Sequence, residues 1–149
     1  IELGDKREMV TIDELPFIVA DVVQSATDQH LIKVLHYSLS VTNGLRPMAS
    51  VKLEIRGEEF EQSASGDGQY NAISKAMYKI YKKLNKPTPE LLDYEVVIPP
   101  GGKTDAIVQT IITWQFEGKT FRTRGLDGDQ TVAAIKATEK MLNIIESGM

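Results

Sequence analysis

The chain has 149 residues, 42% of them hydrophobic and 26% charged, which is typical of a globular protein with its own core. Its net charge of −4 disfavours general affinity for nucleic acid or for an anionic membrane. The absence of cysteine excludes disulfides, thiolate metal sites and a cysteine nucleophile, and it fits a reducing cytoplasm. No apolar run approaches the roughly 20 residues that cross a bilayer, so no membrane-spanning helix is expected.

Residues 1–26 are predicted to be the end of a preceding helical subdomain and a connector. Thr11-Ile12-Asp13-Glu14 is similar to a capping box and favours a short helix near residues 12–22, disturbed by Pro16. The opening residues lack the layout of a signal peptide. Because the chain does not begin with Met, we expect it to be a piece of a longer protein.

Residues 27–149 contain one pattern twice, at a spacing of 61 residues. The identical pairs are Leu31/Leu92, Gly57/Gly118, Phe60/Phe121, Gln69/Gln130, Ala72/Ala133, Lys75/Lys136 and Ala76/Ala137. The ordered match of strands, turn and helix is stronger evidence than the identities. We therefore predict an α+β domain of two βββα units, residues 28–86 and 90–147, with antiparallel sheets and helices on one side.

In the first unit we predict strands at residues 31–41, 49–55 and 59–64, with a turn at Gly57. Residues 49–55 alternate apolar and polar side chains, the period of a half-buried strand. A Gly/Asp-rich break at residues 65–68 then precedes a helix. Its apolar stripe consists of Ala72, Ile73, Ala76, Met77, Ile80 and Leu84.

In the second unit we predict strands at residues 94–98, 107–116 and 119–124, a break at 125–129, and a second helix. Its apolar stripe consists of Ala133, Ala134, Ala137, Met141, Leu142 and Ile145. Aspartates before each helix, namely Asp67, Asp127 and Asp129, are expected to cap it. One three-stranded sheet would expose an apolar face, so we expect the units to pack together or across a dimer.

A catalytic site is not expected. His30 and His36 have no nearby nucleophile and no metal-like spacing, and the carboxylates form no recognisable acid–base pair. The Gly66-Asp67-Gly68 turn is no phosphate loop, because it lacks the Gly-Lys-Ser/Thr ending. Backbone N–H groups at such a turn could receive the carboxylate of a zwitterionic ligand, although a plain helix cap is an equally good interpretation.

A double-stranded RNA-binding module has a similar outline and is the alternative from another functional class. That module needs lysines at the start of its last helix to reach phosphates. Residues 69–72 and 130–133 carry none, and Lys75 and Lys136 stand beside Asp67 and Asp129. The charge distribution therefore disfavours RNA binding.

The chain resembles the C-terminal regulatory domain of the 2-isopropylmalate synthase and citramalate synthase family. The resemblance covers residues 28–146 and rests on residues 46–53, 64–72, 92–96, 102–108 and 125–137. It departs where Gly66-Asp67-Gly68-Gln69 replaces the family's Gly-Asn-Gly-Pro turn. The chain looks most like the domain of a bacterial citramalate synthase, for which the resemblance implies feedback inhibition by isoleucine. A leucine-controlled 2-isopropylmalate synthase is the alternative.

The resemblance further implies a homodimer whose parent enzyme is an acyltransferase. Its upstream barrel would condense acetyl-CoA with pyruvate using a divalent metal, so no cofactor is expected in this chain. The effector site is implied between the units, near the dimer interface, as an apolar slot with hydroxyls and loop amides at one end. The matching residues are Tyr70, Asn71, Leu91, Tyr94, Ile98, Thr104, Ala106 and Val108. For Leu91, Ile98 and Val108, a role in the core is an equally good interpretation.

Overall fold

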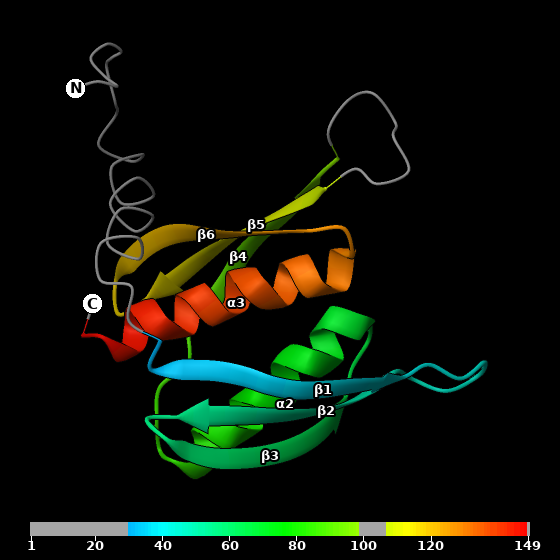
Figure 1. Ribbon diagram of the computed structural model, residues 1–149, viewed down its shortest axis with the longest axis horizontal. Coiled ribbons are helices and arrows are strands. Elements are labelled where there is room, and N and C mark those ends of the chain that lie inside the picture. Colours follow the sequence, from blue (N-terminus) through cyan, green and yellow to red (C-terminus); the bar gives the residue numbers. More distant parts are fainter. Residues whose placement is uncertain (1–29, 99–106, 149) are drawn as a thin grey trace.

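A computed structural model of the protein describes residues 30–98 and 107–148 (Figure 1). The elements are β1 (Ile32–Ser40), β2 (Met48–Ile55), β3 (Glu58–Ser65), α2 (Gln69–Lys83), β4 (Glu90–Val97), β5 (Val108–Phe116), β6 (Lys119–Asp127) and α3 (Gln130–Glu146). They form two antiparallel three-stranded sheets, ordered β1-β2-β3 and β4-β5-β6. The predicted α+β fold of two βββα units is confirmed. The predicted short helix near residues 12–22 lies outside the described residues.

Each sheet has one buried face, which its own helix covers (Figure 1). In β2 the buried side chains alternate along the strand, at Ala49, Val51, Leu53 and Ile55. The same alternation recurs in β5, at Thr110, Ile112, Trp114 and Phe116. The predicted helical stripes are the residues that meet these faces, and only their last members, Leu84 and Ile145, are half-buried. The pleat and the helical period thus explain how each unit builds its share of the core.

The hairpins β2–β3 and β5–β6 use the same two-residue turn. Arg56 and Gly57 have φ angles of 49° and 89°, and Glu117 and Gly118 have φ angles of 51° and 81°. Positive φ at both central residues matches the right-handed twist of the flanking strands. The predicted turns at Gly57 and Gly118 are therefore confirmed.

The first strands of the two units are related by 57 residues rather than 61. Tyr37 lies opposite Val51 in the first sheet, and Tyr94 lies opposite Ile112 in the second. The predicted equivalence of Leu31 and Leu92 is therefore wrong. β4 also begins at Glu90, four residues before the predicted start of that strand. The pattern misled because the four extra residues lie in the longer connection between β4 and β5, after the strand being matched.

The predicted break at residues 125–129 is partly wrong, because β6 continues to Asp127. Gly125 lies within the strand, and a Cβ there would come 2.0 Å from the carbonyl oxygen of Ala133. At the corresponding position of the first unit, a Cβ on Gly66 would come 2.5 Å from the backbone nitrogen of Ala72. These glycines permit a close approach of strand and helix.

Only one of the two helices has an aspartate cap. The side chain of Asp129 accepts hydrogen bonds from the backbone N–H groups of Thr131 (2.7 Å) and Val132 (3.1 Å) at the start of α3. The N-cap of α2 is Gly68, with no side-chain hydrogen bond, so the predicted cap by Asp67 is wrong. Asp67 stands one residue too early, and its carboxylate instead pairs with Arg46 at 2.9 Å.

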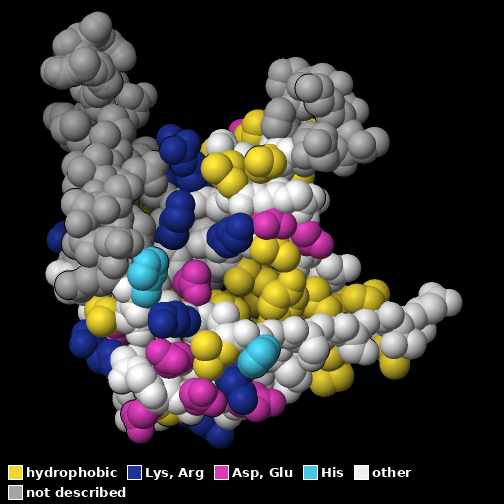
Figure 2. Space-filling view, in the orientation of Figure 1, with side chains coloured by type: hydrophobic (Ala, Val, Ile, Leu, Met, Phe, Trp, Pro, Cys, Tyr) yellow, Lys and Arg dark blue, Asp and Glu magenta, His cyan; other side chains and the backbone are white. Residues whose placement is uncertain are grey.

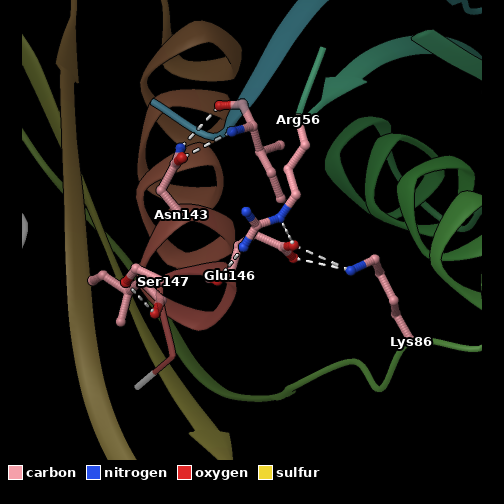
Figure 3. A network of polar contacts seen from close by, with 7 residues as sticks. Arg56, Lys86, Asn143, Glu146 and Ser147 are labelled. Atoms are coloured by element: carbon pink, nitrogen blue, oxygen red, sulfur yellow. Dashed lines mark hydrogen bonds and ion pairs between the residues drawn. The ribbon is translucent and has the colours of Figure 1, made fainter. Parts of the chain in front are cut away.

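The end of α3 connects the second unit to the first (Figure 3). The Glu146 carboxylate accepts hydrogen bonds from Arg56 Nε at 2.7 Å and from Lys86 Nζ at 3.2 Å. Burial opposes ionisation of Glu146, but these hydrogen bonds outweigh burial and hold the pKa of Glu146 below its usual range. The turn of the first sheet and the segment between the units therefore both meet the last turn of α3.

Candidate ligand-binding site

Two tyrosines from different units meet between the sheets. Tyr70 lies in the first turn of α2 and Tyr94 lies in β4. Their ring centroids are 5.3 Å apart, with an interplanar angle of 44°. This distance is in the favourable range for tilted aromatic pairs. The predicted site residues Tyr70 and Tyr94, 24 positions apart in the sequence, are thus in contact.

The Tyr70 hydroxyl is tied to α3 through Thr138. The two hydroxyl oxygens are 2.6 Å apart, and Thr138 Oγ1 lies 2.8 Å from the carbonyl oxygen of Ala134. A threonine hydroxyl has one proton, and the Ala134 carbonyl can only accept it. Tyr70 therefore donates to Thr138. Burial, followed by the neighbouring Tyr78, raises the pKa of Tyr70 far above its usual value, so the phenol stays a neutral donor.

Tyr94 is also tied to α3, through a hydrogen bond with the side chain of Gln130. Gln130 is the first residue of that helix. Burial raises the pKa of Tyr94 above its usual value. Any shift of either tyrosine upon ligand binding would therefore be felt by α3.

The buried face of the second sheet continues from Tyr94 towards the open end of β4. Val96 lies opposite Thr110, and Val108 lies opposite Asp127. The Thr110 side chain is fully buried, and its hydroxyl has no hydrogen-bond partner. An unpaired buried hydroxyl costs free energy, so Thr110 marks a place where a polar guest would be stabilised.

The first turn of α2 leaves backbone N–H groups without a side-chain acceptor. Gly68 offers no cap, and the first N–H to bond within the helix is that of Ala72, which donates to the Gly68 carbonyl at 2.9 Å. Asn71 Oδ1 accepts from the backbone N–H of Asp67 at 2.9 Å. Asn71 therefore closes the turn before the helix, while the N–H groups just ahead of Ala72 can meet a negative group.

The other predicted site residues lie along the same β4–β5 hairpin. Leu91 lies opposite Trp114 at the start of β4 and is 40% exposed. Ile98 follows the end of β4 and is 66% exposed, whereas Val108 is half-buried at the start of β5. Thr104 and Ala106 lie outside the described residues.

Sequence reasoning missed three polar residues around the tyrosines. Gln130 and Thr138 were taken as parts of a helix, and Thr110 as part of a strand. A signal was present for Thr110, because it takes a buried position in register with Ile112, Trp114 and Phe116. No sequence signal connected Thr138 with Tyr70, because that contact joins the two units.

Hydrophobic side chains gather on the surface near this region. Figure 2 shows them between the units, close to the start of α2, and again along the β1–β2 hairpin. The exposed members on that hairpin are Tyr37, Val41, Leu45 and Met48. Exposed apolar surface of this extent is typical of a face that meets a ligand or another protein.

Two kinds of site were searched for among residues 30–98 and 107–148. No group of three or more His, Asp or Glu residues there is placed to hold a metal ion. No helix in this part of the chain is long and apolar enough to cross a membrane.

The model of the LeuA allosteric (dimerisation) domain family matches residues 9–146. The chain belongs to this family. The resemblance predicted from the sequence is thereby confirmed, and the match favours an allosteric domain over an RNA-binding module.

Individual relatives carry two different names. The 2-isopropylmalate synthase of Aquifex aeolicus is 32% identical over 143 residues, which cover 95% of this chain and 26% of the relative. The putative (R)-citramalate synthase CimA of Methanosarcina mazei is 28% identical over 142 residues, which cover 95% of this chain and 29% of the relative. The corresponding protein of Archaeoglobus fulgidus is 31% identical over 146 residues, which cover 97% and 29%. The chain thus spans less than a third of these relatives.

Proposed function

We propose that this chain is the regulatory domain of a citramalate synthase and that it binds isoleucine, as a feedback inhibitor, between its two units. The observation that carries the proposal is the contact of Tyr70 with Tyr94. It joins the two units at one point, and both tyrosines are hydrogen-bonded to α3. The family match supports the allosteric role.

A branched-chain amino acid has three groups to satisfy, and the described residues offer a partner for two of them. Val96 and Val108 provide an apolar wall for the side chain, beside Tyr94. The uncapped N–H groups of α2 face the carboxylate, whose charge suits the positive end of a helix. The ammonium group would add favourable charge near the exposed Asp67.

Leucine is the second candidate, with a 2-isopropylmalate synthase as the parent enzyme. The similarity to the Aquifex aeolicus enzyme favours it. Isoleucine and leucine have the same number of atoms, so only the shape of the slot separates them. Valine lacks one methylene, and such a loss lowers affinity by roughly 10- to 200-fold.

The parent's chemistry is proposed to lie outside this chain. Acyl transfer from acetyl-CoA to pyruvate, with its divalent metal, would take place in a catalytic region that precedes residue 1. The domain would act in a cytoplasmic homodimer. Inhibition would then be a coupling between two sites, typically 1–3 kcal/mol in allosteric proteins.

Calorimetric titration of this chain with isoleucine, leucine and valine tests the proposal. We expect isoleucine to bind most tightly and valine at least about tenfold more weakly. Tighter binding of leucine would assign the second candidate. A duplex RNA titrated in parallel should give no heat above dilution. Absence of binding by all three amino acids would contradict the proposal.

A matched pair of variants locates the site. Tyr94→Ala should weaken binding by at least about tenfold, since it removes an aromatic wall worth on the order of 1.4 kcal/mol or more. Tyr37→Ala changes the equivalent residue of the first unit and should leave the affinity within about twofold. Equal effects of the two substitutions would place the ligand elsewhere.

A further inference from the structure

Helix α3 satisfies the free edge of β1 with its side chains. The backbone N–H of Ile32 donates to Asn143 Oδ1 at 2.9 Å, and Asn143 Nδ2 donates to the carbonyl oxygen of Ile32 at 2.9 Å (Figure 3). The backbone N–H of Val34 donates to Glu139 Oε2 at 2.8 Å. These three hydrogen bonds, called the edge contact below, replace the neighbouring strand that an edge lacks.

The edge contact is held in one geometry. Asn143 Nδ2 also lies 2.9 Å from the carbonyl oxygen of Glu139, one helical turn earlier. Asn143 is 4% exposed and Ile32 is fully buried. A buried backbone pair with no water to replace its partners depends on Asn143 alone. Strand β1 therefore follows any displacement of this part of α3.

The same helix holds the candidate ligand site. Thr138 accepts from Tyr70 and is the direct neighbour of Glu139. Asn143 lies five residues further, about 7.5 Å along a helix that rises 1.5 Å per residue. Gln130, at the start of the helix, binds Tyr94. One rigid element thus touches both tyrosines and the first strand of the domain.

The first unit has no counterpart of the edge contact. At the spacing of 61 residues, Asn143 and Glu139 correspond to Lys82 and Tyr78 of α2. Among the described residues, neither of these makes a hydrogen bond to β4. The contact is therefore specific to the strand that continues directly from residues 1–29.

We propose that Asn143 and Glu139 transmit the state of the Tyr70–Tyr94 site to β1, and that the edge contact is the output of the domain towards the preceding part of the chain. This inference rests on the proposed function, because it names the route by which an amino acid at that site acts. Asn143 and Glu139 are positioning residues and do not touch the ligand. A bound amino acid holds α3 against both tyrosines, and α3 then holds β1.

Amide hydrogen exchange, measured residue by residue on this chain, tests the route. Isoleucine and leucine are added in separate samples at saturating concentration. We expect either bound ligand to slow exchange at Ile32 and Val34 by at least about fivefold more than at the amides of β3, the lower limit of ordinary allosteric coupling. β3 lies at the opposite edge of the same sheet.

Three variants separate transmission from folding. Glu139→Ala removes only the acceptor for Val34, and we expect it to abolish the extra slowing at Val34 while the calorimetric affinity stays within about twofold. Glu139→Gln keeps an acceptor oxygen and should restore the response. Lys82→Ala, at the position equivalent to Asn143, should leave the response unchanged.

The outcomes are distinguishable. Ligand binding without extra slowing at Ile32 and Val34 overturns the inference and leaves the proposed function standing. A full response in Glu139→Ala also overturns it. If neither amino acid binds the unmodified chain, the proposed function fails and the inference fails with it.

Discussion

The two sheets have the same three strands, yet their first strands have different surroundings. The outer edge of β1 is covered by α3, through Asn143 and Glu139. The first residues of β4 are more open, with Leu91 and Leu92 40% and 47% exposed. A duplicated unit has thus specialised. One copy receives the helix of the other, while the second keeps an accessible strand beside the candidate site.

The largest effect of this difference is expected at Asn143. Asn143→Ala leaves the buried N–H and C=O of Ile32 unpaired, and each unpaired group costs about 1–3 kcal/mol. We expect the free energy of unfolding to fall by about 3 kcal/mol. Lys82→Ala, at the equivalent position of α2, should change it by less than about 0.5 kcal/mol. Urea unfolding of both variants measures this, and equal losses would show that the two edges do not differ.

The Glu146 network makes the contact of the two units dependent on pH. The pKa of Glu146 is lowered, so the ionised carboxylate stabilises the fold above its ordinary pKa. This contribution is lost as pH falls through the lowered value. Glu146→Gln should cost about 1 kcal/mol at pH 7 and should show a weaker loss of stability below pH 4.5 than the unmodified chain.

Glu59→Gln serves as the control for that experiment, because the exposed Glu59 meets Lys52 only at 3.7 Å. Surface pairs of this kind contribute little, so its effect at pH 7 should be below about 0.5 kcal/mol. Denaturant unfolding between pH 3 and pH 8 supplies both comparisons. Parallel pH profiles of Glu146→Gln and the unmodified chain would contradict the assigned role of Glu146.

The helix starts differ in the same way as the edges, and a smaller effect is expected there. Asp129→Ala removes the cap of α3 and should cost about 1 kcal/mol. Asp67→Ala removes only an exposed pair with Arg46 and should cost less than about 0.5 kcal/mol. Thermal unfolding of the two variants decides, and a larger loss for Asp67→Ala would mean that Asp67 does support α2.

The smallest change in stability is expected at Gly68. This residue has extended backbone, and a Cβ there would meet nothing within 4 Å. Gly68→Asp should cap α2 and raise stability by a few tenths of a kcal/mol. It should also weaken isoleucine binding by at least about fivefold, because its carboxylate occupies the N–H groups proposed for the ligand. Unchanged affinity in a stabilised variant would remove those N–H groups from the site.

The sequence by itself determined the repeated architecture of this protein. The period of two in residues 49–55 and the helical spacing of the apolar stripes arise from local backbone geometry, and any one unit displays them. The two-residue turns were equally visible, because positive φ favours glycine at Gly57 and Gly118. The aromatic pair was predicted as part of one site through the family resemblance, and the structure brings Tyr70 and Tyr94 into contact.

Only the tertiary structure decided how the two copies differ. Asn143 is a single polar residue beside the apolar stripe of its helix, and its partner Ile32 lies 111 residues earlier in the chain. The 57-residue relation of β1 and β4 likewise depends on how each strand pairs with its neighbour, after a connection of different length. Local patterns cannot record such partners, because a free strand edge is satisfied by whichever donor and acceptor the packing brings to it.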